Sequence, residues 1–244
     1  MANLKECAGE GRHRFDADLH EKCPVCGAGI RGEAGEVTPS SPKSKFNKGL
    51  VIALAVLAVV GFLVVKVQMN DKQAIEFYNN GNKYYNSKQY DRALDEYNKA
   101  IDLNSKYGAA YNRRGNVYYL TKKYDEAYSD LSKAIELKST DDNAYLYRGH
   151  IYYIKKEYSS AVADYSKAIE INPNDVKALY WRGIAQYNLK QYNKSIEDFD
   201  KTIKISPKYA DAYYWRSKSY SAIGNKAYAN RDYDTAVKLG WKKK

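Results

Sequence analysis

The pattern of apolar and polar residues divides the chain into three segments of different chemistry. An uncharged apolar run, Leu50 to Val65, separates a polar N-terminal segment from a long region with a fixed period. In that region glycine recurs every 34 residues, and serine takes the fifth position, at Gly81, Gly115, Gly149, Gly183 and Ser217. Such a period is typical of a repeat protein, whose units bury their apolar faces against one another.

Other residue types keep the same period. Tyrosine recurs at 90, 124, 158 and 192, small residues at Ala93, Ala127, Ala161, Ser195 and Ala229, and bulky residues at Tyr97, Leu131, Tyr165, Phe199 and Tyr233. A second small-residue series runs Ala100, Ala134, Ala168, Thr202 and Ala236. Spacings of four and seven place these residues on one helical stripe, which predicts two helices per unit. We expect Pro173 and Pro207 to end units, and the second helices to be capped by Asp91, Asp125, Ser159 and Asn193.

The recurring order of Gly, aromatic, Ala, bulky residue and Ala, with Pro in two units, resembles the tetratricopeptide repeat family. The resemblance covers residues 74–244. It implies an all-α fold, a right-handed superhelix of five helix-turn-helix repeats at 74–107, 108–141, 142–175, 176–209 and 210–243.

The resemblance to this family implies that first-helix residues line a concave groove that binds a protein or an extended peptide. Amide side chains can bond a peptide backbone, and aromatic side chains give a large contact area. The corresponding positions are Asn82, Asn112, Arg113, Asn116, Tyr119, Asn143, Tyr147, His150, Tyr153, Tyr180, Trp181, Tyr187, Tyr214 and Trp215.

An arginine also recurs at 34-residue spacing from the second repeat onward, and an acidic residue precedes each arginine by 18 positions. We expect these residues to form ion pairs between successive repeats. The predicted pairs are Glu96–Arg114, Asp130–Arg148, Asp164–Arg182 and Asp198–Arg216.

The apolar run predicts a single transmembrane helix at residues 49–67. A helix of 19 residues is about 28 Å long, close to the thickness of the hydrocarbon core of a bilayer. A cleaved signal peptide is disfavoured because a long polar segment precedes the run and no small-residue cleavage site follows it. Lys43, Lys45 and Lys48 precede the run, so the positive-inside tendency places the N-terminus in the cytoplasm and the repeats outside it.

The N-terminal segment, residues 1–31, contains all three cysteines, with Cys23 and Cys26 in a CPVCG turn. Two cysteines at this spacing can bind one zinc ion, and the metal would stabilise a segment too small to fold alone. The segment resembles zinc ribbons of bacterial membrane-anchored proteins, which implies the ligands Cys7, His13, Cys23 and Cys26 and a bacterial origin. His20 is the alternative fourth ligand; a redox dithiol and unliganded cysteines are the competing interpretations. Residues 32–48 form a Pro- and Ser-containing linker.

The net charge of +11 comes mostly from the repeat region, where thirty Lys and Arg stand against twenty-one Asp and Glu. We interpret the chain as a single-pass membrane protein and a scaffold for protein–protein interaction. The alternative is a basic zinc-ribbon protein that binds nucleic acid or an anionic envelope polymer; the membrane helix and the lack of a basic stripe interleaved with aromatics make nucleic acid the weaker candidate. We expect no enzymatic activity, because the sequence contains no nucleophile–base signature or phosphate-binding glycine loop.

Overall fold

The computed structural model describes residues 4–6, 14–16, 48–138 and 141–242. The chain forms two compact units, Met1–Val56 and Leu57–Lys244, which we describe separately. In the first unit, strands β1 (Leu4–Glu6) and β2 (Arg14–Asp16) pair antiparallel, with Leu4 opposite Asp16 and Glu6 opposite Arg14. Helix α1 (Lys48–Asn86) begins in this unit and continues into the second.

Helix α1 is 39 residues long and contains the apolar run. Its large apolar side chains from Ile52 to Met69 are at least half exposed, so no other part of the described chain covers them fully. By length and composition this helix could cross a membrane. Its last part, from Ala74 onward, is the first helix of the first repeat, so the two regions share one continuous helix.

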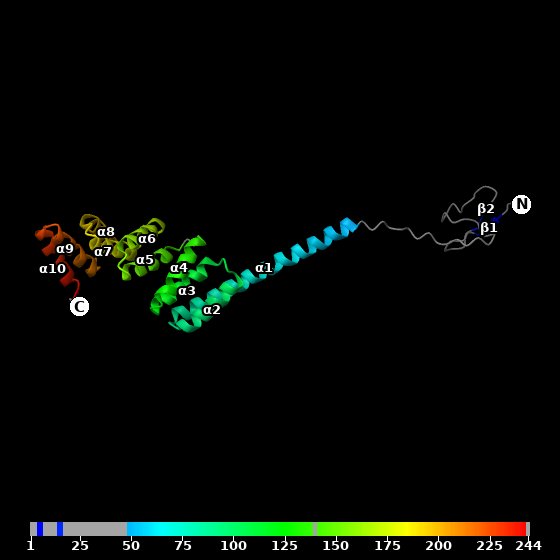
Figure 1. Ribbon diagram of the computed structural model, residues 1–244, viewed down its shortest axis with the longest axis horizontal. Coiled ribbons are helices and arrows are strands. Elements are labelled where there is room, and N and C mark those ends of the chain that lie inside the picture. Colours follow the sequence, from blue (N-terminus) through cyan, green and yellow to red (C-terminus); the bar gives the residue numbers. More distant parts are fainter. Residues whose placement is uncertain (1–3, 7–13, 17–47, 139–140, 243–244) are drawn as a thin grey trace. The chain divides into compact units, whose positions relative to one another are not determined.

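Nine helices follow in the described part of the chain (Figure 1). Helix α2 packs against the last part of α1, and the other eight form four antiparallel pairs. Their bounds are α2 (Tyr90–Leu103), α3 (Gly108–Leu120), α4 (Tyr124–Glu136), α5 (Asp142–Ile154), α6 (Tyr158–Ile171), α7 (Val176–Asn188), α8 (Tyr192–Ile205), α9 (Ala210–Ala222) and α10 (Lys226–Lys238). The prediction of two helices per repeat is confirmed.

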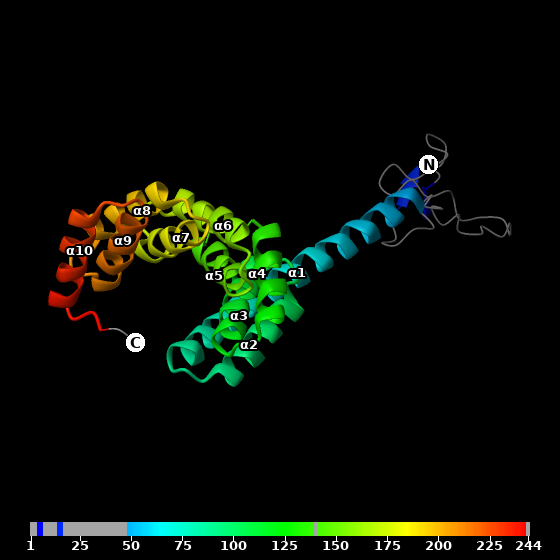
Figure 2. The ribbon, with the colours of Figure 1, turned by 60° about the vertical axis from the view of Figure 1, so that its left-hand side comes forward.

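Successive pairs stack in chain order. Each first helix contacts its own second helix and the next first helix, so α3 touches α5, α5 touches α7 and α7 touches α9. Figure 2 shows α6, α8 and α10 along the outer side of a curve, with α5, α7 and α9 along its inner side. We call the surface of the first helices on that side the inner face.

The periodic glycines let the two helices of a repeat approach closely. A Cβ at Gly149 would lie 2.7 Å from the Tyr165 ring, and one at Gly81 would lie 2.5 Å from Tyr97. Such distances are shorter than van der Waals contact allows. The bulky side chains opposite the first four glycines are completely buried, as are most of the periodic alanines. Together they form the core that runs through the array.

The turn between the two helices of a repeat contains one residue in the left-handed backbone region. Lys88, Lys122, Lys156 and Lys190 have φ between 57 and 63°, and Gly224 has φ 82°. A residue in this conformation turns the chain so that the backbone N–H groups that follow bond the last carbonyl groups of the helix, which ends it. The conformation costs an L-residue free energy that glycine does not pay.

The predicted capping of the second helices is wrong. The residues that precede α2, α4, α6 and α8 are Gln89, Lys123, Glu157 and Gln191, and none makes a side-chain cap hydrogen bond. Because each helix already begins at the periodic tyrosine, Asp91, Asp125, Ser159 and Asn193 lie inside the first turn. In the first turn the negative charge of an aspartate still interacts favourably with the helix dipole and stabilises the helix.

The predicted pairing between successive repeats is also wrong. Each arginine pairs with the aspartate 16 residues after it, in the second helix of its own repeat. Arg148 donates to both carboxylate oxygens of Asp164, at 2.7 and 2.8 Å. The physical reason is that the second helix folds back antiparallel onto the first, which brings positions 16 apart into contact.

A third nitrogen of each arginine does connect neighbouring repeats. Nη1 donates to the side chain 16 residues earlier, in the preceding second helix. For Arg148 that partner is Ser132, and for Arg114 it is Asn98. The first repeat has Asn80 instead of arginine, and its Glu96 bonds Lys99, its neighbour one turn along α2.

Candidate functional site

The predicted groove residues all belong to first helices, and their aromatic members form a strip across three repeats. Tyr119 on α3 lies 5.1 Å from Tyr147 on α5, measured between ring centroids. His150, one turn further along α5, lies 5.0 Å from Trp181 on α7, and Tyr153 lies 5.3 Å from the same indole. We call these five residues the aromatic strip. Edge-to-face and tilted contacts at these distances are favourable.

The C-terminal repeats continue the arrangement. Tyr187 on α7 meets Trp215 on α9 edge-on at 5.4 Å, and Tyr214 neighbours the same indole. Trp241 stacks on Tyr214 at 3.9 Å. Each of these rings is partly exposed, which leaves part of its surface free for contact with another molecule.

Tyr180 is placed differently from the other predicted aromatics. Its side chain is buried against Phe199 and Ala212, and its ring contacts Tyr209 at a centroid distance of 4.9 Å. Burial raises the pKa of its hydroxyl above the ordinary value. Tyr180 therefore packs the joint between the fourth and fifth repeats.

Three of the predicted amides are used within the protein. Asn82 accepts a hydrogen bond from the Tyr97 hydroxyl at 2.9 Å. Asn112 is completely buried and donates to Asp141 at 2.7 Å, and Asn143 donates to the same carboxylate at 2.6 Å. Asp141 thus joins two successive first helices, because it also caps α5 through the backbone N–H of Asn143.

Several buried polar atoms on α3 have no hydrogen-bond partner among the described residues. They are the side-chain oxygens of Asn112 and Asn116, one turn apart, and Nε of Arg113. The Arg113 guanidinium lies over the Tyr85 ring, 5.7 Å from its centroid. Buried polar atoms without partners are costly, because each has given up its hydrogen bonds to water.

His150 is a neutral, structural member of the aromatic strip. Its Nδ1 and the Tyr165 hydroxyl are hydrogen-bonded at 2.7 Å. Burial, assisted by the positive charge of Lys177, lowers the pKa of His150 to about 3. Burial and the neighbouring Tyr85 raise the pKa of Tyr147 to about 12. Both groups therefore stay uncharged near neutral pH, which suits recognition rather than proton transfer.

Two residues of the inner face were not among the predicted ones. Tyr85 occupies the position of Tyr119 and Tyr153 in the first repeat, and Lys218 occupies the position of Asn116 and His150 in the fifth. The 34-residue period contained the signal for both. The predicted zinc ligands Cys7, His13, Cys23 and Cys26, and the alternative His20, lie outside the described residues.

Comparisons with known proteins agree on the repeat region. The family model described as "Tetratricopeptide repeat" matches residues 108–141 and 176–209, and the one described as "TPR repeat" matches residues 81–122 and 149–190. No curated protein sequence matches the chain.

Many solved structures are similar. The crystal structure of YrrB, described as "a TPR protein with an unusual peptide-binding site", is 26% identical with a TM-score of 0.64, covering 71% of this chain and 90% of that one. A crystal structure of MamA protein is 23% identical with a TM-score of 0.62, covering 69% of this chain and 92% of that one. The likeness to MamA shows the fold alone.

Proposed function

Since the chain is a tetratricopeptide repeat protein, we propose that it is a membrane-tethered scaffold whose inner face binds an extended peptide or protein segment. The aromatic strip is the observation that carries this proposal. Its residues come from three successive repeats, and the rings of Tyr119, Tyr147, Tyr153 and Trp181 are partly exposed around the buried His150. Rigid aromatic side chains held by their neighbours give contact area at low entropic cost, as at many protein interfaces.

The polar part of the inner face supports a peptide ligand. Arg113 on α3 and Asn143 on α5 are half-buried on this face, and a guanidinium or an amide group can bond the backbone of an extended peptide. YrrB, 26% identical, is described as having a peptide-binding site, which favours the same class of ligand here.

The exposed apolar part of α1 supports membrane tethering. Large apolar side chains cover this helix on all sides, and such a surface is stable in lipid but not in water. Lysines gather before the run in the sequence, which favours a cytoplasmic N-terminus and repeats on the other side of the membrane. Protease treatment of intact cells tests this orientation, because the protease reaches the repeats only if they lie on the outer side of the membrane.

The N-terminal segment is proposed to bind one structural zinc ion through Cys7, His13, Cys23 and Cys26. Zinc prefers four sulfur or nitrogen ligands, and the two-residue spacer of CPVCG lets Cys23 and Cys26 reach one ion. His13 is the fourth ligand that the resemblance to zinc ribbons implies, with His20 as the alternative.

Crosslinking in membranes tests the scaffold function. The full chain should yield a crosslinked protein that is lost in the Trp181→Ala variant and kept in the Tyr128→Ala variant. Tyr128 is the matched control because it is an exposed tyrosine on α4, a second helix. Circular dichroism shows whether both variants remain folded. Undiminished crosslinking by Trp181→Ala would contradict the proposed role of the aromatic strip.

Salt dependence separates the protein ligand from the alternative of an anionic polymer. Binding to a polyanion weakens steeply as salt rises because bound counterions are released. Capture of one protein that tolerates salt supports the scaffold, whereas salt-sensitive binding of RNA or another polyanion supports the alternative.

A further inference from the structure

The fifth repeat departs from the other four at the contact between its two helices. Ser217 stands where the other repeats have glycine, and its side chain is buried with Oγ donating to the Tyr214 carbonyl oxygen at 2.7 Å. Tyr233 stands where the others have Tyr97, Leu131, Tyr165 and Phe199, all 0% exposed, yet Tyr233 is 45% exposed. The serine side chain occupies the place over which the ring would otherwise lie.

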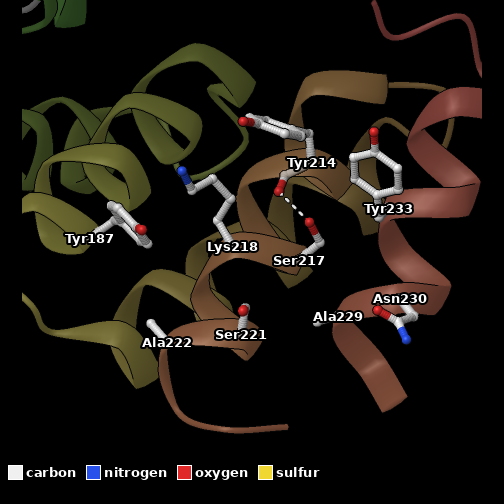
Figure 3. A pocket seen from close by; sticks show the side chains of 9 residues that line it. All are labelled: Tyr187, Tyr214, Ser217, Lys218, Ser221, Ala222, Ala229, Asn230 and Tyr233. Atoms are coloured by element: carbon white, nitrogen blue, oxygen red, sulfur yellow. Dashed lines mark hydrogen bonds between the residues drawn. The ribbon is translucent and has the colours of Figure 1, made fainter. Parts of the chain in front are cut away.

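A pocket of about 410 Å³ lies between α9 and α10 beside this contact (Figure 3). Ser217 and Ser221 line it from α9, and Ala229 and Asn230 line it from α10. The pocket is continuous with the inner face, because Tyr187 of the preceding repeat also lines it. Its walls combine apolar methyl groups and tyrosine rings with a few hydroxyl and amide groups.

The charge of the pocket is positive. Lys218 is the one charged residue that lines it, and no carboxylate of the described residues lies within 4 Å of its ammonium group. The ammonium group lies 5.9 Å from the ring centroids of Tyr187 and Trp215. An anionic group beside the pocket would therefore meet an unpaired cation held over two rings.

Trp241, which follows α10, packs against two side chains that line the pocket. Trp241 stacks on Tyr214 and meets Tyr233 edge-on at a centroid distance of 5.9 Å. These contacts hold the Tyr233 ring outward, so the pocket stays open toward the inner face.

We propose that this pocket anchors a peptide bound on the inner face, taking one aromatic side chain whose neighbouring acidic residue pairs with Lys218. The inference rests on the proposed peptide-binding function and adds the chemistry of the ligand. An aromatic occupant is favoured because the same position is filled by a bulky side chain in all four other repeats, and by a ring in three of them. The ligand's ring enters the pocket beside the Ser217 side chain, in the space that the outward position of Tyr233 leaves between α9 and α10.

Random twelve-residue peptides displayed on phage, selected against the full chain in lipid nanodiscs, test the proposal. The expected enriched sequences contain an aromatic residue next to Asp or Glu. For one synthetic enriched peptide, replacement of the aromatic residue by Ala, or of its acidic neighbour by Asn or Gln, should weaken binding at least about tenfold, a loss of about 1.4 kcal/mol.

Three variants locate the binding to the pocket. Ser217→Gly lets Tyr233 pack inward as in the other repeats, and Ser221→Leu fills the pocket even if Tyr233 does not move. Both variants should therefore weaken binding of the enriched peptide. Lys218→Gln removes the charge and should abolish only the preference for the acidic residue. The matched control is Lys238→Gln, an exposed lysine on α10 that does not line the pocket and should bind like the unchanged protein.

The outcomes separate this inference from the proposed function. If the peptides bind Ser217→Gly and Ser221→Leu as well as they bind the unchanged protein, the pocket is not their binding site, although the inner face can still be one. Enriched peptides without an aromatic–acidic pair would overturn the proposed ligand chemistry. Selection of no peptide at all would count against both.

Discussion

The arginine–aspartate pairs give the sharpest test of how the array is held together. Replacing Asp164 by Asn removes the negative charge from a pair in which Arg148 donates two hydrogen bonds, at 2.7 and 2.8 Å. The side chains of Arg148 and Asp164 are only 18% and 8% exposed. The variant therefore leaves an almost enclosed guanidinium without its counter-charge.

The magnitude follows from that burial. Breaking a buried ion pair by removing one partner costs about 3 to 5 kcal/mol, and the remaining exposure of Arg148 places the expected loss near 3 kcal/mol. With a urea m-value of about 2 to 3 kcal/mol per molar, the unfolding midpoint should fall by about 1 M. Replacing the whole pair by Arg148→Met with Asp164→Leu should cost far less, because no charge is left unpaired.

Urea unfolding of the full chain in detergent, monitored by circular dichroism, measures these shifts in the unfolding midpoint. Glu96→Gln is the matched control, because Glu96 holds the equivalent acidic position in the first repeat and bonds the exposed Lys99. It should leave the midpoint unchanged, whereas Asp130→Asn should match Asp164→Asn. A large effect of Glu96→Gln, or none of Asp164→Asn, would refute the pairing within repeats.

Further predictions concern backbone, pH and metal. Gly149→Ala should lower stability by about 1 to 2 kcal/mol in the same urea assay, because the Cβ meets Tyr165 and the cost exceeds the gain in helix propensity; an unchanged midpoint would contradict the close contact. Lys156→Gly should raise stability by about 1 kcal/mol, since the residue has φ 62°; a lower midpoint would show that the turn is not strained. The depressed pKa of His150, about 3, means that the unfolded state binds an extra proton below about pH 6.5, so stability should fall by about 1.4 kcal/mol per pH unit as the pH drops from there toward 3. His150→Gln should remove this slope; an identical slope in both proteins would assign it elsewhere. Native mass spectrometry should find one zinc ion in the full chain and none in Cys23→Ser; wild-type protein purified with zinc but lacking the ion would end the zinc proposal.

Much of the fold could be predicted from periodicity alone. Glycine and a bulky residue 16 positions later keep constant places through four repeats, and only helices that pack closely require that combination. The apolar run predicted a helix at residues 49–67, because no polar face interrupts it, and the structure extends that helix to Asn86. These features are local or strictly periodic, so the sequence displays them directly.

The partners of the periodic charges could not be read in this way. Arg114 has an acidic residue 18 positions before it and another 16 positions after it, and both series repeat every 34 residues. Periodicity cannot choose between them. Only the antiparallel return of each second helix onto the first brings Arg114 beside Asp130 and leaves Glu96 with Lys99.

The candidate site likewise combines features that the sequence displays with features that only the tertiary structure sets. The sequence by itself determined which positions belong to the first helices, and it displayed Ser217 as a break in the glycine series. Tertiary structure alone decided that Asn112 is enclosed beside Asp141, and that Tyr233 lies outward and leaves a pocket. Burial depends on what the neighbouring helices place opposite a side chain, and a single position in a sequence does not contain that information.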